Sequence, residues 1–198
     1  MTDVLGAVKA HVTAYFAGRG STAEPVGASV TFLGADPIEV LRYGPTDSDV
    51  YHYASQGCSR YPMADPTDMM ADGISGPRAE AVLSLRGPTP PGLARSIAVL
   101  ASAPAVEGLI LEPDALIDLQ EPVWQGAAFT AFLLGASEIG DVELPEPYQP
   151  VRILTATPIT ATEAAWVRLK GADAMRDAWQ QDGVDVLDQR RRAAEPRP

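Results

Sequence analysis

The chain has 198 residues, of which 46% are hydrophobic, and this is enough for one globular domain with a sizeable core. Its net charge of −11 at pH 7 argues against non-specific binding to nucleic acid, because phosphate contacts need clustered Lys and Arg. The longest apolar run, Ala127–Leu134, is too short to span a membrane, and the N-terminal sequence lacks the basic and apolar segments of a signal peptide. We therefore expect a cytoplasmic protein, without an internal disulfide because Cys58 is the only cysteine.

The N-terminal part has the pattern of one helix followed by strands. Apolar residues at helical spacing predict a helix that opens at Thr2–Asp3 and closes at Gly18. Apolar and tyrosine-rich runs then predict three strands, at residues 26–32, 38–43 and 50–55. The segment from Ser59 to Pro77 contains three prolines and is expected to be an irregular loop.

The middle of the chain combines strands with one helix. Alternating small and apolar residues predict a strand at Ala79–Arg86, and Pro91–Ala103 has the pattern of a helix with Leu93, Ile97 and Leu100 facing inward. Further strands are expected at residues 108–111, 116–119 and 127–134, followed by a proline-rich connector at residues 141–150.

The segment from Val151 to Gly171 combines a strand with a capped helix. Val151–Thr157 predicts a mostly buried strand, and Pro158 is expected to end it because proline cannot donate to a sheet ladder. Thr160 lies three residues before Glu163, which is the spacing of a capping box. Gly171 is expected to end this helix, and a second short helix should follow.

Helices at both ends with strands between them predict an α+β fold with a mixed, mostly antiparallel sheet flanked by helices. We expect a single domain at residues 21–189, with an N-terminal helix at residues 1–20 packed on it. Residues 190–198 are charged and are expected to form a disordered tail.

Two clusters of side chains allow an enzyme hypothesis, of a hydrolase type. His52 and Cys58 are six residues apart and could form a thiol–imidazole pair, because a cysteine nucleophile needs a base. Asp65, Asp68 and Asp72 could bind a hard cation from the loop. The alternative to the thiol–imidazole pair is that Cys58 is a core residue and His52 an ordinary strand residue. The alternative to the cation site is that the three carboxylates are solvated. We prefer these alternatives and expect no catalytic, cofactor-binding or metal-binding residues.

Aromatic and charged side chains beside the long loop are candidates for contact with a protein partner. The five candidates are Tyr51, Tyr53, Arg60, Tyr61 and Asp65. Ordinary packing between neighbouring strands is the alternative explanation for the tyrosines.

Several features also occur in a family-like order between about Thr22 and Arg192. They are Gly57-Cys58-Ser59 after a tyrosine-rich strand, Arg78-Ala79-Glu80 opening a strand, Gly108–Asp114, Phe129–Leu134, Pro158-Ile159-Thr160 with Glu163 and Gly171, and an Asp188…Arg190 ending. In order and spacing this set resembles the suppressor-of-fused (SUFU-like) domain in its bacterial form. Cys58 and the small residues Ala79–Ala81 depart from the family's usual pattern.

The resemblance implies a binding module and not an enzyme. Animal members of the family sequester a transcription factor by clamping an extended peptide with the help of a second domain, which we do not expect in this chain. Bacterial members have been proposed as immunity proteins that neutralise a cognate toxin, often a basic one, and the acidity of this chain agrees with that role. A regulatory scaffold that binds an extended peptide at a sheet edge is a further alternative. The oligomeric state stays open.

Overall fold

A computed structural model describes residues 2–65, 67, 69 and 72–195 of the chain. Its helices are α1 (Val4–Ala17), α2 (Leu93–Glu107), α3 (Ala161–Lys170) and α4 (Ala172–Gln181). Its strands are β1 (Val26–Val30), β2 (Ile38–Thr46), β3 (Val50–Gln56), β4 (Arg78–Arg86), β5 (Leu116–Asp118), β6 (Phe129–Ala136) and β7 (Val151–Thr160). Among these described residues, no helix has both the length and the apolar character needed to cross a bilayer.

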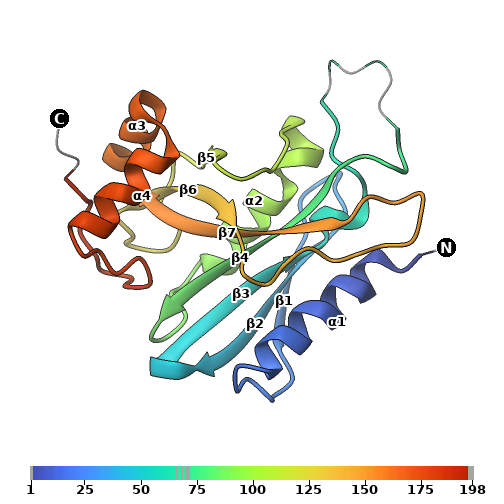
Figure 1. The fold of residues 1–198 in the computed structure, drawn as a ribbon, viewed down its shortest axis with the longest axis horizontal. Coiled ribbons are helices and arrows are strands. Elements are labelled where there is room, and N and C mark those ends of the chain that lie inside the picture. Colours follow the sequence, from blue (N-terminus) through green and yellow to red (C-terminus); the bar gives the residue numbers. More distant parts are fainter. Residues whose placement is uncertain (1, 66, 68, 70–71, 196–198) are drawn as a thin grey trace.

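All seven strands join in one sheet in the order β1-β2-β3-β4-β7-β6-β5 (Figure 1). Only β4 and β7 pair in parallel, and every other neighbouring pair is antiparallel. The expected α+β fold with a mixed, mostly antiparallel sheet is therefore confirmed. Strands β1 and β5 form the two edges of the sheet.

The helices cover both faces of this sheet. Helix α2 packs on one face and contributes Leu93, Ile97 and Leu100 to the largest core cluster, as predicted. The opposite face is shared by α1, which packs over β2, β4 and β7, and by the α3–α4 pair, which packs over β6 and the end of β7 (Figure 1). Successive side chains of β6 point to opposite faces of the sheet, so that Phe132 packs in the α2 cluster and Leu133 in the α3–α4 cluster.

Helix α1 forms and packs as its sequence pattern predicts. Asp3 caps it by accepting a hydrogen bond from the amide of Gly6 at 2.9 Å, and Gly18 follows its last residue. Four buried side chains repeat every four residues and lie on one stripe that faces the sheet: Val4, Val8, Val12 and Phe16.

Three expectations about individual elements were wrong. Strand β7 does not end at Pro158 but continues to Thr160. The proline is tolerated because β4 pairs with β7 only as far as Thr155, so the missing N–H lies on an open side of the strand while β6 pairs on the other. Residues 108–111 form no strand, because their apolar pattern reflects the burial of Leu111 without sheet pairing. Helix α2 starts two residues after Pro91 and runs on to Glu107.

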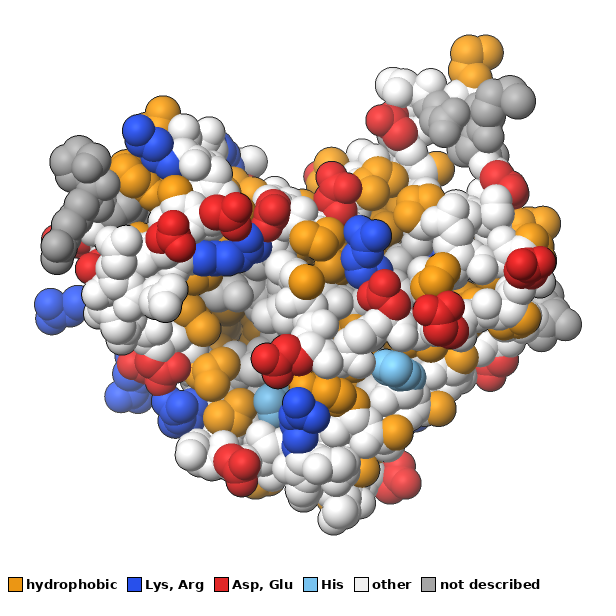
Figure 2. Space-filling view, in the orientation of Figure 1, with side chains coloured by type: hydrophobic (Ala, Val, Ile, Leu, Met, Phe, Trp, Pro, Cys, Tyr) orange, Lys and Arg blue, Asp and Glu red, His pale blue; other side chains and the backbone are white. Residues whose placement is uncertain are grey.

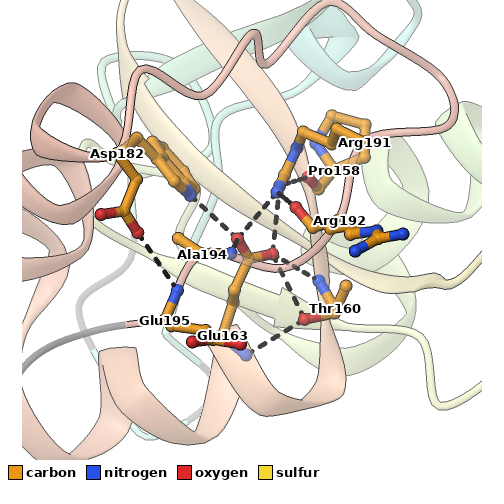
Figure 3. Close-up of polar contacts among 9 residues, drawn as sticks. Pro158, Thr160, Glu163, Asp182, Arg191, Arg192, Ala194 and Glu195 are labelled. Atoms are coloured by element: carbon orange, nitrogen blue, oxygen red, sulfur yellow. Dashed lines mark hydrogen bonds and ion pairs between the residues drawn. The ribbon is translucent and has the colours of Figure 1, made fainter.

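The C-terminal segment is held by a buried ion pair, contrary to the frayed tail expected from residue 190 (Figure 3). The carboxylate of Glu163 is fully buried and accepts hydrogen bonds from Arg191 Nη1 at 2.8 Å, from Trp179 Nε1 at 3.0 Å and from the amide of Ala194 at 3.0 Å. It also accepts from the amide of Thr160, which completes the predicted capping box. Burial alone would raise the pKa of Glu163, but these hydrogen bonds hold it below its ordinary value.

Candidate protein-binding surface

A buried carboxylate shapes the turn that follows β3. Glu80 on β4 is 1% exposed, and its Oε1 accepts hydrogen bonds from the amides of Gly57 and Ser59, at 2.8 and 2.9 Å, and from the Ser59 hydroxyl at 2.6 Å. Its Oε2 accepts from the hydroxyl of Ser55 at 2.5 Å. Four donors on one carboxylate satisfy the backbone of the turn and fix the direction in which the chain leaves the sheet.

The neighbouring Arg78 fixes the carbonyl side of the same turn. Its Nη1 donates to the carbonyl oxygens of Ser59 at 2.7 Å and Arg60 at 2.9 Å, and its Nη2 donates to that of Ile74 at 3.2 Å. Arg78 is 3% exposed and lies two residues from Glu80 on the same face of β4. The two side chains together hold the short 3₁₀ turn Cys58–Arg60 and the far end of the loop after it.

This turn forms one wall of a largely apolar hollow of about 360 Å³, which we call the Tyr61 hollow. The loop between β1 and β2 and the C-terminal end of α2 form the other walls. Its floor and sides include Ile38, Cys58, Met63, Ala101 and Pro104.

Three large apolar side chains at the rim of the Tyr61 hollow are exposed to solvent. The exposed fractions are 107% for Leu33, 61% for Tyr61 and 63% for Val106. Tyr61 also lines a second hollow, of about 560 Å³, on its other side, where Leu5, Ile74 and Tyr148 are found. Exposed apolar side chains that gather around a concavity are typical of a protein-interaction site.

The structure places four of the five predicted partner-binding residues in two separate places. Arg60 and Tyr61 lie beside the hollows, and Arg60 is 4.0 Å from the carboxylate of Asp36. Tyr51 and Tyr53 point to the α2 face nearer the start of β3 and do not line the Tyr61 hollow.

Tyr53 is part of the core, as the alternative explanation for the tyrosines proposed. It is 3% exposed, and its hydroxyl group is hydrogen-bonded to Thr89 Oγ1 at 2.8 Å. Tyr51 is half-buried, with the guanidinium of Arg42 5.3 Å from its ring centre. The predicted contact of these two tyrosines with a partner remains untested.

The thiol–imidazole pair does not form. Both ring nitrogens of His52 are engaged elsewhere, with Nε2 2.8 Å from Thr46 Oγ1 and Nδ1 2.7 Å from Ser84 Oγ. The ring stacks on Phe16 under α1, whereas Cys58 packs against the α2 side of the sheet. Burial, with a smaller contribution from Glu80, raises the pKa of the Cys58 thiol well above its ordinary value, which is the opposite of what a nucleophile needs.

The aspartates of the loop close local turns. Asp65 accepts from the amide and hydroxyl of Thr67, at 2.8 and 2.6 Å, and these bonds lower its pKa. Asp72 accepts from the amide of Ile74 and from the Ser75 hydroxyl. Asp68, the third member of the proposed cation site, lies outside the described residues. Within residues 2–65, 67, 69 and 72–195, no cluster of three metal-binding side chains occurs.

Acidic side chains outnumber basic ones, with 26 Asp and Glu against 15 Lys and Arg. They are spread over most of the face drawn in Figure 2, consistent with the net charge of −11. Near the Tyr61 hollow, Asp36 lies on the β1–β2 loop, and Glu107 ends α2. The C-terminal end of a helix is itself the negative end of its dipole, so the potential there is favourable to cations.

Sequence reasoning missed the residues that make up most of the Tyr61 hollow. Leu33 directly follows the strand expected at residues 26–32 and Val106 lies beyond the end of the helix expected at Pro91–Ala103, and neither was identified as exposed. A turn such as Leu33-Gly34-Ala35-Asp36 that carries a large apolar residue at its tip is the one local signal that could have identified this surface.

Comparisons with known proteins identify the class of domain. A model of the suppressor of fused protein family (SUFU) matches residues 34–192, and the chain therefore belongs to this family. No curated protein sequence matches the chain. The resemblance inferred from the sequence is thus confirmed.

Solved structures show the same fold at low sequence identity. A SUFU homologue from Neisseria gonorrhoeae FA 1090 is 16% identical, with a TM-score of 0.69 over 99% of both chains. A chain of the Sufu–Fu complex is 14% identical, with a TM-score of 0.68 over 96% of this chain and 91% of that one. Drosophila Suppressor of Fused is 15% identical with a TM-score of 0.62, and the match spans 96% of this chain but 51% of the Drosophila chain.

Proposed function

We propose that this chain is a non-catalytic protein-binding module of the suppressor-of-fused family, and that it acts in the bacterial cytoplasm as an immunity-type protein that neutralises a cognate, basic toxin. The observation that carries the proposal is the Tyr61 hollow, a concavity ringed by exposed apolar side chains on a strongly acidic protein. An apolar centre with a charged surround is the usual anatomy of a protein interface.

The charge of the chain supports a basic partner. A net charge of −11 would accelerate encounter with a positively charged protein and would repel nucleic acid. A family relative has been crystallised in a Sufu–Fu complex, and this association of a related fold with a protein partner is in keeping with a binding role.

The proposal is tested with the product of a toxin-like gene adjacent to the gene for this chain, prepared as a catalytically inactive variant. We expect a complex by isothermal titration calorimetry that weakens as salt is raised, because screening reduces the attraction of opposite charges. Co-expression should also relieve the toxicity of the active form. The absence of a complex at micromolar concentrations, together with unrelieved toxicity, would exclude the immunity role.

A regulatory scaffold is the second candidate. Edge strand β1 pairs with β2 on one side, its first four residues are exposed, and the exposed fraction of Val26 is 58%. An edge of this kind can accept an extended peptide as an additional strand. Light scattering over a range of protein concentrations separates a monomer from an assembly formed through this edge.

A further inference from the structure

We infer that the Tyr61 hollow receives an apolar side chain that a basic protein partner presents directly beside a Lys or Arg. This inference depends on the proposed function, because it names the part of the partner that the module would recognise.

The Tyr61 hollow is largely apolar and already formed. A volume of about 360 Å³ lies at the lower end of the range for ligand cavities and suits one large side chain with its flanking backbone. Buried Ile38, Met63 and Ala101 contribute to its lining, and none of them brings a charged group. A polar or charged side chain placed in it would lose its hydration without gaining a partner.

The wall of the hollow formed by the turn after β3 is held in place by close packing and hydrogen bonds. Gly57 brings the turn after β3 against the β1–β2 loop at a φ of +145°, where a Cβ atom would lie 2.8 Å from Ile38 Cδ1 and 3.1 Å from the carbonyl oxygen of Pro37. The four hydrogen bonds to Glu80 fix the same turn from below. A preformed pocket costs little ordering entropy on binding, as is typical of pockets that receive a dominant anchor side chain.

The charges around the rim favour a basic partner. Asp36 lies on one wall, and the opposite wall is the C-terminal end of α2, whose last residue is Glu107. Arg60, the residue before Tyr61, has its guanidinium 4.0 Å from the carboxylate of Asp36. Because Asp36 lines the hollow and the negative end of the α2 dipole borders it, with Glu107 directly after the lining residue Val106, the rim favours a cation next to the apolar anchor and disfavours an acidic segment.

The inference is tested first with short peptides, without the need for the native partner. Three acetylated, amidated peptides, SRFKS, SRSKS and SEFES, are titrated to millimolar concentration into the ¹⁵N-labelled protein. We expect SRFKS to shift the amide signals of Leu33, Cys58, Tyr61 and Val106. SRSKS, which lacks the anchor, and SEFES, which reverses the charge, should leave them in place. If SRFKS shifts none of these signals, or if SEFES shifts them equally, the inference is wrong.

A second measurement separates this inference from the proposed function. Leu33→Asp and Val106→Asp place a charge on the rim, and Leu169→Asp is the matched control because Leu169 is 73% exposed on α3, away from the hollow. In titrations with the inactive toxin, we expect the two rim variants to weaken binding by roughly tenfold or more, as at an interface hot spot, and the control to bind within about twofold of the unaltered protein. Binding that all three variants retain would overturn the inference and leave the proposed function standing.

Discussion

Replacing Glu80 with alanine should loosen the turn that forms one wall of the Tyr61 hollow and reduce stability at the same time. The carboxylate is buried and accepts four hydrogen bonds, two of them from the amides of Gly57 and Ser59. In Glu80→Ala these two amides lose their acceptor in a place that water does not reach. We therefore expect both a lower free energy of unfolding and greater access to Cys58, which lies between them in the chain.

The magnitude follows from the donors that are left without a partner. An unsatisfied buried donor costs about 1–3 kcal/mol, so the two amides alone give a loss of about 2–6 kcal/mol for Glu80→Ala. Glu80→Gln preserves the size of the side chain and leaves one oxygen to accept. The free energy of unfolding of Glu80→Gln should fall by about 1.5–3 kcal/mol. The hydrogen bond from the Ser55 hydroxyl to a charged carboxylate oxygen is lost, because an NH₂ group takes the place of that oxygen.

The assay is urea unfolding followed by tryptophan fluorescence, combined with the rate at which a thiol reagent modifies Cys58. Glu138→Ala is the control, because the side chain of Glu138 is 91% exposed and its ion pair with Arg19 is long, at 3.9 Å. Its free energy of unfolding should change by no more than about 0.5 kcal/mol. The thiol of Cys58, the only cysteine, should react faster in Glu80→Ala and at an unchanged rate in the control.

Two results would refute this reasoning. A loss of less than about 1 kcal/mol in Glu80→Ala would mean that the amides of the turn find other acceptors. An unchanged rate of Cys58 modification, with stability clearly lowered, would mean that the carboxylate stabilises the protein globally without positioning the wall of the hollow.

Three further predictions concern the face of the sheet that α1, α3 and α4 cover. Burial lowers the pKa of His52 to about 4, below the unfolded-state value near 6.5. The contribution of neutral His52 to the free energy of unfolding should therefore be fully present above pH 6.5 and should be lost as the pH falls towards 4. Urea unfolding across this pH range should show a flatter pH dependence for His52→Gln. Arg191→Met leaves the buried carboxylate of Glu163 without its ion pair and should lower the free energy of unfolding by about 3–5 kcal/mol in the same assay. Thr160→Ala removes the cap of α3 and should cost about 1 kcal/mol in thermal unfolding while leaving partner affinity unchanged.

The family-like motifs found in the sequence have a common structural explanation. Gly57-Cys58-Ser59 and Arg78-Ala79-Glu80 are separated in the chain, but Glu80 accepts hydrogen bonds from Gly57 and Ser59, and Arg78 donates to the carbonyl oxygen of Ser59. Sequence reasoning recognised both segments as markers without connecting them. The connection depends on the pairing of β3 with β4, which no local pattern specifies.

Glu163 makes one contact that a local pattern predicts and one that it does not. The Thr160–Glu163 spacing correctly predicted a capping box, which is a contact within one turn of helix. The ion pair joins Glu163 to Arg191, which is 28 residues further along the chain. Arg191 was expected to belong to a disordered tail. Local composition indicated a charged terminus, whereas the buried carboxylate provides the partner that orders it.

The sequence by itself determined the local features of this protein. The stripe of α1, the caps of α1 and α3 and the alternation of β4 follow from the spacing of residues near one another, because hydrogen bonding and periodicity act over a few positions. Residues of β4 and of the α3 cap were also among the motifs of the family resemblance, and the order of helices and strands predicted the α+β class.

Only the tertiary structure decided where a partner could bind. The Tyr61 hollow joins the β1–β2 loop, the turn after β3 and the end of α2, which are separated by up to about 70 residues of chain. Whether an apolar side chain is buried or exposed depends on which distant elements cover it, and not on its neighbours in sequence. Leu33 and Leu41 are the same residue type eight positions apart, yet the first is fully exposed and the second is covered by α1.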